Sequence, residues 1–175
     1  MPLTNFLRQY ETLRLYSATP VIPKTTNDTP QVLCLKDREI LIPAGVRVQL
    51  NVTALHLNPQ YWGITAAQWQ PDRWIEGSNS GLESLKKPVE GSFLPWSEGP
   101  RVCPGRKFSQ VEFVAAIATL FQHHKVRAAA LGGENSEATK SRIVRMINNS
   151  KLQGITIQMM DPKAVALVWT RSASL

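Results

Sequence analysis

The sequence has 175 residues, of which 43% are hydrophobic, and its 20 Lys and Arg against 13 Asp and Glu give a formal net charge of +7. This composition excludes an intrinsically disordered chain and suffices for a domain with its own hydrophobic core. The positive charge permits an acidic partner, but no DNA-binding motif and no basic stripe interleaved with aromatic residues occurs. We therefore expect no nucleic-acid partner.

Two cysteines, Cys34 and Cys103, are too few for a disulfide framework. Cys34 falls in a strand-like run and is interpreted as a packing residue, although a bridge to Cys103 stays open. His56 stands far from the other histidines, and we interpret it as structural because metal sites need several ligands. The charged first 15 residues do not suit a secretory signal, and no uncharged apolar run is long enough to span a bilayer.

Residues 3–15 are predicted to form a helix because apolar side chains recur at helical spacing. These side chains are Leu3, Phe6, Leu7, Tyr10 and Leu13. Glu11 and Arg14 stand three residues apart and therefore share one helix face. Taken alone, the pair indicates a surface ion pair, which contributes little to stability.

Short strands are predicted after this helix. Pro20 and Pro23 end the helix and require an extended backbone. β-branched and apolar residues predict strands at residues 31–35 and 39–42, and a period-two alternation predicts a third at 46–51.

The second half of the chain is predicted to contain one long helix, from residue 106 to about residue 124. Apolar residues lie on several of its faces, which is typical of a buried helix. Residues 77–91 and 128–141 are predicted to be loops because they are rich in Gly and polar residues. Two strands are expected at residues 154–158 and 165–170.

The loop from Phe93 to Gly105 carries the strongest chemical signal. It places Cys103 between an arginine and a glycine, just ahead of the long helix, and a thiolate in that position can bind a metal. Gly99 and Gly105 allow tight turns and a close approach to a flat ligand, while Arg101 can reach an anionic group on it. The alternative is a buried cysteine without a ligand.

This loop resembles the haem-thiolate signature of the cytochrome P-450 family, Phe-x-x-Gly-x-Arg-x-Cys-x-Gly. It matches at Gly99, Arg101, Cys103 and Gly105, and it departs at Trp96, where Phe is usual. Trp keeps an aromatic face and adds an N–H donor. A hydrogen bond from that donor to the sulfur would tune the iron.

Two further motifs follow the family's order. Glu11-x-x-Arg14 resembles the Glu-x-x-Arg motif of the family's K helix, and residues 71–74 are similar to its Pro-Glu-Arg-Phe segment, with Asp72 for Glu and Trp for Phe. The resemblance implies that Glu11, Arg14 and Arg73 form one structural network. Charges brought into the interior in this way must be paired and hydrogen-bonded.

The resemblance also implies a set of cofactor-binding residues. Cys103 would be the axial ligand of a haem iron, with Gly105 and Trp96 beside it. Arg101 and Lys24 would approach the anionic propionates of the haem, although a plain surface lysine is the alternative for Lys24. Residues 18–22 would pass over the haem and face the substrate.

The fold class implied is mixed α/β and mainly α, the C-terminal part of the cytochrome P-450 fold. Its parts would be a K-like helix, a small β-sheet, the cysteine haem loop, an L-like helix and a C-terminal hairpin. Residues 1–175 are expected to be the C-terminal portion of a single domain, without its N-terminal half and distal I helix. The amino-acid sequence of the cysteine loop is similar to that of fungal members.

The function implied is a haem-binding oxidoreductase that inserts one oxygen atom from O₂ into a small organic substrate. Electrons would come from NADPH through a flavin-containing reductase, and Arg106 and Lys107 would suit its acidic surface. The resemblance implies full-length relatives that usually reside in the endoplasmic reticulum membrane. The location of this chain itself is unknown.

We expect the chain alone to be weakly active or inactive. The alternative is a non-catalytic remnant or interaction module that does not hold haem. A basic nucleic-acid binder is a third, weaker option, which salt-dependent DNA binding without a haem signal would favour.

Overall fold

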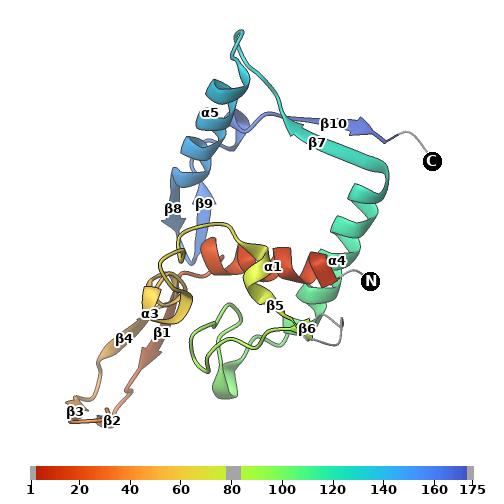
Figure 1. Ribbon diagram of the computed structural model, residues 1–175. Coiled ribbons are helices and arrows are strands. Elements are labelled where there is room, and N and C mark those ends of the chain that lie inside the picture. Colours follow the sequence, from red (N-terminus) through yellow and green to blue (C-terminus); the bar gives the residue numbers. More distant parts are fainter. Residues whose placement is uncertain (1–2, 78–83, 173–175) are drawn as a thin grey trace.

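The computed structural model describes residues 3–77 and 84–172 (Figure 1). The helices are α1 (Leu3–Leu15), α2 (Val52–His56), α3 (Pro59–Trp62), α4 (Arg106–His123) and α5 (Ser136–Asn148). Short 3-10 helices occur at Pro71–Trp74, Gly99–Arg101 and Pro162–Ala164. In Figure 1, α1 lies at the centre, α4 runs up one side, and the first strands extend away from α1 as an arm.

All strands of the described residues form two-stranded antiparallel sheets. The pairs are β1 (Val21–Thr25) with β4 (Arg47–Asn51), β2 (Gln31–Cys34) with β3 (Glu39–Ile42), β5 (Ile75–Glu76) with β6 (Ser84–Leu85), β7 (His124–Ala128) with β10 (Leu167–Arg171), and β8 (Ser150–Gln153) with β9 (Thr156–Met159). The strands expected near residues 31–35, 39–42 and 46–51 are confirmed. They do not form one sheet, because β4 pairs with β1 while β2 and β3 pair only with each other.

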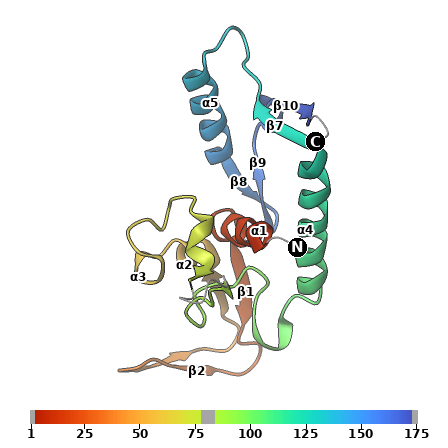
Figure 2. The ribbon, with the colours of Figure 1, turned by 45° about the vertical axis from the view of Figure 1, so that its right-hand side comes forward.

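The C-terminal part differs most from the prediction. The strands expected at 154–158 and 165–170 do not pair with each other, so the predicted hairpin is wrong. The left-handed Gly154 (φ 63°) instead allows a two-residue turn that joins β8 to β9. β10 pairs with β7, which continues directly from α4, as Figure 2 shows.

Helix α5 falls partly within the loop predicted at residues 128–141, so that prediction is also corrected. Asn135 caps the helix, since its side chain accepts a hydrogen bond from the Ala138 N–H at 2.8 Å. Arg142 of α5 ties the surrounding segments together by donating to the carboxylate of Glu134 and to the carbonyls of Ala129 and Ala164. In the loop expected at 77–91, Ser84 and Leu85 form β6, and residues 78–83 lie outside the described part.

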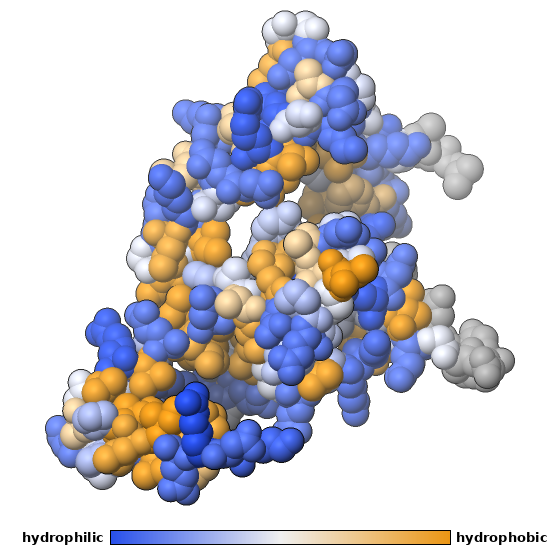
Figure 3. Space-filling model, turned by 60° about the vertical axis from the view of Figure 1, so that its left-hand side comes forward, coloured by the Kyte–Doolittle hydropathy of each residue, from blue (hydrophilic) through white to orange (hydrophobic). Residues whose placement is uncertain are grey.

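The buried apolar core of the described residues is small. It consists of Leu7, Val52, Ala66, Trp74 and Val114. The accessible surface is 12798 Å², about 1.5-fold the ~8,500 Å² expected of a compact monomer of this length. Figure 3 accordingly shows hydrophobic groups spread over the visible face.

Helix α4 is covered on one face only. Val114 is fully buried, while Phe108 is 70% and Val111 61% exposed. The prediction that this helix is buried on several faces is therefore wrong for the described residues, because α1 is the main element that packs against it and β7 simply follows it in the chain. In the same described residues, no helix combines the length and the apolar character that crossing a bilayer requires.

Candidate functional site

The cysteine loop is folded by its own backbone. The Cys103 N–H donates to the Trp96 carbonyl at 2.8 Å, and the Val102 N–H donates to the Gly99 carbonyl at 3.0 Å. Two residues adopt left-handed backbone angles, Gly99 with φ 77° and Ser97 with φ 62°. Glycine takes this conformation without a steric penalty, which explains its place at residue 99. The loop thus closes on itself just before α4 begins.

Cys103 is exposed and lies in a shallow groove of about 190 Å³. The groove is lined by Thr19, Ile22, Leu94, Pro95, Trp96, Ser97, Arg101 and Cys103. A Cβ atom placed on Gly105 would lie 3.8 Å from the Cys103 Sγ, so the glycine leaves space beside the sulfur. An accessible thiol with open space next to it is suited to a flat ligand that approaches closely.

The structure brings Arg101 and two residues of the 18–22 segment to the Cys103 groove. Arg101 is exposed and ends the 3-10 helix that precedes the cysteine. Lys24 lies further along, on β1 opposite Val48, and is not among the residues that line the groove. Of the two basic residues expected near the propionates, only Arg101 therefore shares the groove with Cys103.

The indole of Trp96 does not donate to the sulfur. Its Nε1–H donates to the Ser109 Oγ at 2.9 Å, and the Ser109 hydroxyl donates in turn to the Arg106 carbonyl. The Arg106 guanidinium lies over the Trp96 ring, 5.4 Å from its centroid. The extra donor of Trp thus fixes the cysteine loop to the first turns of α4. The sequence did not indicate Ser109, because a lone serine on a helix carries no signal.

The carboxylate of Glu11 lies at the centre of a buried charge network. Its side chain is 0% exposed and pairs with both Arg14 (2.8 Å) and Arg73 (3.1 Å). It also accepts hydrogen bonds from the Trp74 indole and the Gln70 N–H, both at 2.9 Å. Burial by itself would raise the pKa of Glu11, but the hydrogen bonds from Arg14, Gln70 and Trp74 hold it below the ordinary value.

Arg14 extends the network toward the cysteine loop. Its guanidinium donates to the carbonyls of His56 (2.9 Å), Ala66 and Gln68, and it lies 5.1 Å from the Trp62 ring centroid. Together with its two bonds to Glu11, these contacts give each of the five N–H donors of the buried cation an acceptor. The structure brings together Glu11, Arg14 and Arg73, the three charged residues that the family resemblance placed in one network.

His56 connects the network to the loop, a role that the sequence did not indicate. The ring is fully buried, and its Nε2 accepts the Leu94 N–H at 2.9 Å. Burial lowers the pKa of His56 to about 4, an effect that the backbone carbonyl of Leu13 opposes and the charge of Arg14 reinforces. No cluster of three metal-ligating side chains occurs among residues 3–77 and 84–172.

Comparisons with known proteins point to one family. The family model for cytochrome P450 matches residues 1–153. A cytochrome P450 monooxygenase of Arthrobotrys oligospora is 31% identical, over 91% of this chain and 30% of its own length. A monooxygenase of the phomenoic acid biosynthesis cluster of Leptosphaeria maculans is 29% identical, over 87% of this chain and 28% of its own.

A solved structure agrees with these sequence matches. The haem domain of cytochrome P450DA superposes with a TM-score of 0.68 at 21% identity, over 99% of this chain and 31% of that domain. The chain thus spans less than a third of the length of these relatives. With a family model that matches most of its residues, the chain belongs to the cytochrome P450 family.

Proposed function

We propose that Cys103 is the thiolate ligand of a haem iron. The observation that carries this proposal is the exposed Cys103 thiol, held in a groove with Arg101 and beside the free space at Gly105. Cys34 is also exposed, but it lies on the β2–β3 hairpin, away from this groove. The residues around Cys103 therefore fit the cofactor that the family implies.

The neighbouring residues would bind and orient the haem. Arg101 supplies a positive charge for an anionic propionate, and Lys24 would supply another further along β1. Gly105 keeps the space beside the sulfur open, and Trp96 holds the loop through its bond to Ser109. The haem, when bound, activates O₂, so that one oxygen atom can be inserted into an organic substrate.

The redox partner in this proposal is a flavin-containing reductase that delivers electrons from NADPH. Arg106 and Lys107 are exposed at the start of α4, directly after the cysteine loop. Their charge would complement an acidic surface on such a reductase. The substrate class is a small organic molecule, and residues 18–22 would contribute one wall of its site.

A second candidate is a module of the same fold that does not hold haem. The large accessible surface and the shallow Cys103 groove favour this alternative, because a water-exposed haem site protects a bound group poorly. For the same reason we expect the chain by itself to be weakly active or inactive as a monooxygenase.

The test is the spectrum of the reduced, haem-supplemented protein under carbon monoxide. A red-shifted Soret band in the wild type that is absent in Cys103→Ala would support thiolate ligation. Cys34→Ala is the matched control, since it removes the other exposed thiol and should leave the band unchanged. A band that survives Cys103→Ala, or no specific band in any variant, would refute the proposal for this chain.

A further inference from the structure

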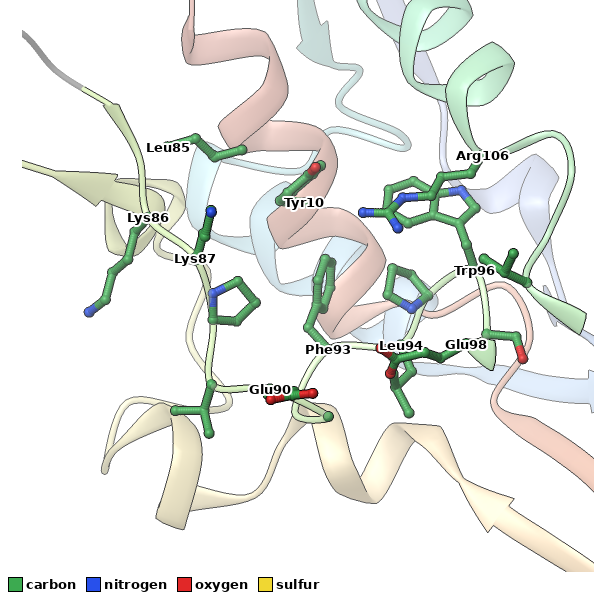
Figure 4. Close-up of a pocket in the computed structure, with 16 residues that line it drawn as sticks. Tyr10, Leu85, Lys86, Lys87, Glu90, Phe93, Leu94, Trp96, Glu98 and Arg106 are labelled. Atoms are coloured by element: carbon green, nitrogen blue, oxygen red, sulfur yellow. The ribbon is translucent and has the colours of Figure 1, made fainter. Parts of the chain in front are cut away.

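A larger cavity of about 530 Å³ lies between the segment 85–91 and the start of the cysteine loop. It shares residues 94–97 with the Cys103 groove but includes neither Cys103 nor Arg101. Figure 4 looks into this cavity. Its volume falls in the range of small-molecule sites, and the haem site proposed above leaves it unused.

Three aromatic rings form one wall of the cavity. The Tyr10 ring lies 5.4 Å from Phe93 and 5.9 Å from Trp96, measured between centroids. Tyr10 is further fixed because its hydroxyl accepts a hydrogen bond from the Gln110 side chain at 2.9 Å. A rigid aromatic wall of this kind favours a planar, aromatic ligand.

Charged groups are sorted to different edges of the cavity. In Figure 4, Lys87 and Arg106 lie on either side of Tyr10 and Phe93, while Glu90 and Glu98 lie toward the opposite edge. Arg106 is held over the Trp96 ring, and within the described residues its guanidinium forms no ion pair or hydrogen bond. Its N–H donors are therefore available to a bound anion.

We propose that this cavity binds an aromatic carboxylate. The ring of the ligand lies against Tyr10, Phe93 and Trp96, and its carboxylate accepts charge-assisted hydrogen bonds from Arg106. The planar guanidinium of Arg106 matches a carboxylate with two parallel hydrogen bonds.

A ligand that also carries a hydroxyl group, at the end of its ring opposite the carboxylate, would place that hydroxyl at the edge of the cavity where Glu90 and Glu98 lie. There it donates to the carboxylate of Glu90 or Glu98. The site thus selects for an acid at one end of the ring and for a hydrogen-bond donor at the other. The cavity includes neither Cys103 nor Arg101, so its occupation can be tested in the haem-free protein.

The test uses 4-hydroxybenzoate and its methyl ester as probes, in isothermal titration calorimetry with the haem-free protein. We expect the acid to bind and the ester to bind at least about 10-fold more weakly, since the ester has lost the ionic acceptor. Arg106→Met should weaken binding of the acid by a similar factor. Lys125→Met removes the same charge from an exposed site on β7 and should leave binding unchanged.

Far-UV circular dichroism establishes whether each variant is folded, and Arg106→Gln replaces Arg106→Met if the latter unfolds. Equal affinity for acid and ester would overturn the proposal, as would no binding at millimolar concentration. So would an equal loss of affinity in Lys125→Met, which would indicate attraction to net charge alone. None of these results bears on the carbon monoxide spectrum, so the two proposals fail separately.

Discussion

Replacing Glu11 by Gln probes the buried charge network directly. Glu11 accepts five hydrogen bonds, from the Nε and Nη2 of Arg14 and from Arg73, Trp74 and Gln70, at distances between 2.8 and 3.1 Å. Gln has the same shape but no charge, and its amide NH₂ would face donors instead of accepting from them. The fully buried Arg14 would then keep its charge without a counter-ion.

Breaking a buried ion pair in this way costs about 3–5 kcal/mol. A domain has about 5–15 kcal/mol of stability in total, so Glu11→Gln should remove a large part of it. With an m-value of about 2 kcal/mol/M in urea, the unfolding midpoint should fall by about 1.5–2.5 M. Urea titration followed by far-UV circular dichroism measures this shift.

Glu134→Gln is the matched control, because it makes the same chemical change in the pair with Arg142. The Glu134 side chain is 23% exposed, and Arg142 keeps its bonds to the carbonyls of Ala129 and Ala164. Its midpoint should therefore fall much less. A Glu11→Gln midpoint close to that of the wild type, or above that of Glu134→Gln, would refute the assignment of Glu11 as the centre of the network.

Three further predictions concern the pH dependence and the cysteine loop. The pKa of His56 is about 4 in the folded protein against the ordinary 6.5 in the unfolded chain. Between these two values the unfolded state binds a proton that the folded state does not, so stability falls by about 3 kcal/mol as the pH drops from 6.5 to about 4. His56→Gln should flatten this slope in urea titrations at several pH values, and an unchanged slope would contradict the lowered pKa. Ser109→Ala removes the hydrogen-bond acceptor of the Trp96 indole. The free energy of unfolding should fall by about 1–3 kcal/mol, and Trp fluorescence emission should shift to the red or broaden. An emission spectrum and a urea midpoint identical to those of the wild type would show that this bond contributes nothing. Gly105→Val places a side chain beside the Cys103 sulfur and should weaken haem retention in gel filtration. Gly77→Val, at a glycine with open space around it, should leave retention unchanged, and equal retention in the two variants would argue against the fit at Gly105.

Local patterns predicted the parts of the fold that local chemistry determines. The helix over residues 3–15 and the strands β2, β3 and β4 lie where the sequence predicted them. Their signals, the spacing of apolar residues and a run of strand-forming residues, are contained in a few neighbouring positions. The loop around Cys103 was likewise predicted, because its glycines, its arginine and its cysteine all lie within a few residues of one another.

Contacts between distant segments escaped prediction. The pairing of β7 with β10 joins residues 39 to 47 positions apart. Helix α5 was missed for another reason, because the glycines before it outweighed its local signals, the Asn135 cap and the amphipathic spacing of its apolar residues. Within the site, the Leu94–His56 and Trp96–Ser109 hydrogen bonds depend on tertiary geometry that residue types do not encode. The family motifs indicated that Glu11, Arg14 and Arg73 form one network, whereas the further partners of that network became known only from the structure.

The link from α1 through His56 to the cysteine loop also bears on the order of folding. Glu11 meets Gln70 and Trp74 across separations of 59 and 63 positions, and His56 meets Leu94 across 38. Contacts of such long range form late, because the intervening chain must first be closed into loops. The groove at Cys103 should therefore mature only after the helices have formed. In a refolding experiment, haem capture should lag behind the helical signal and report on completion of the core.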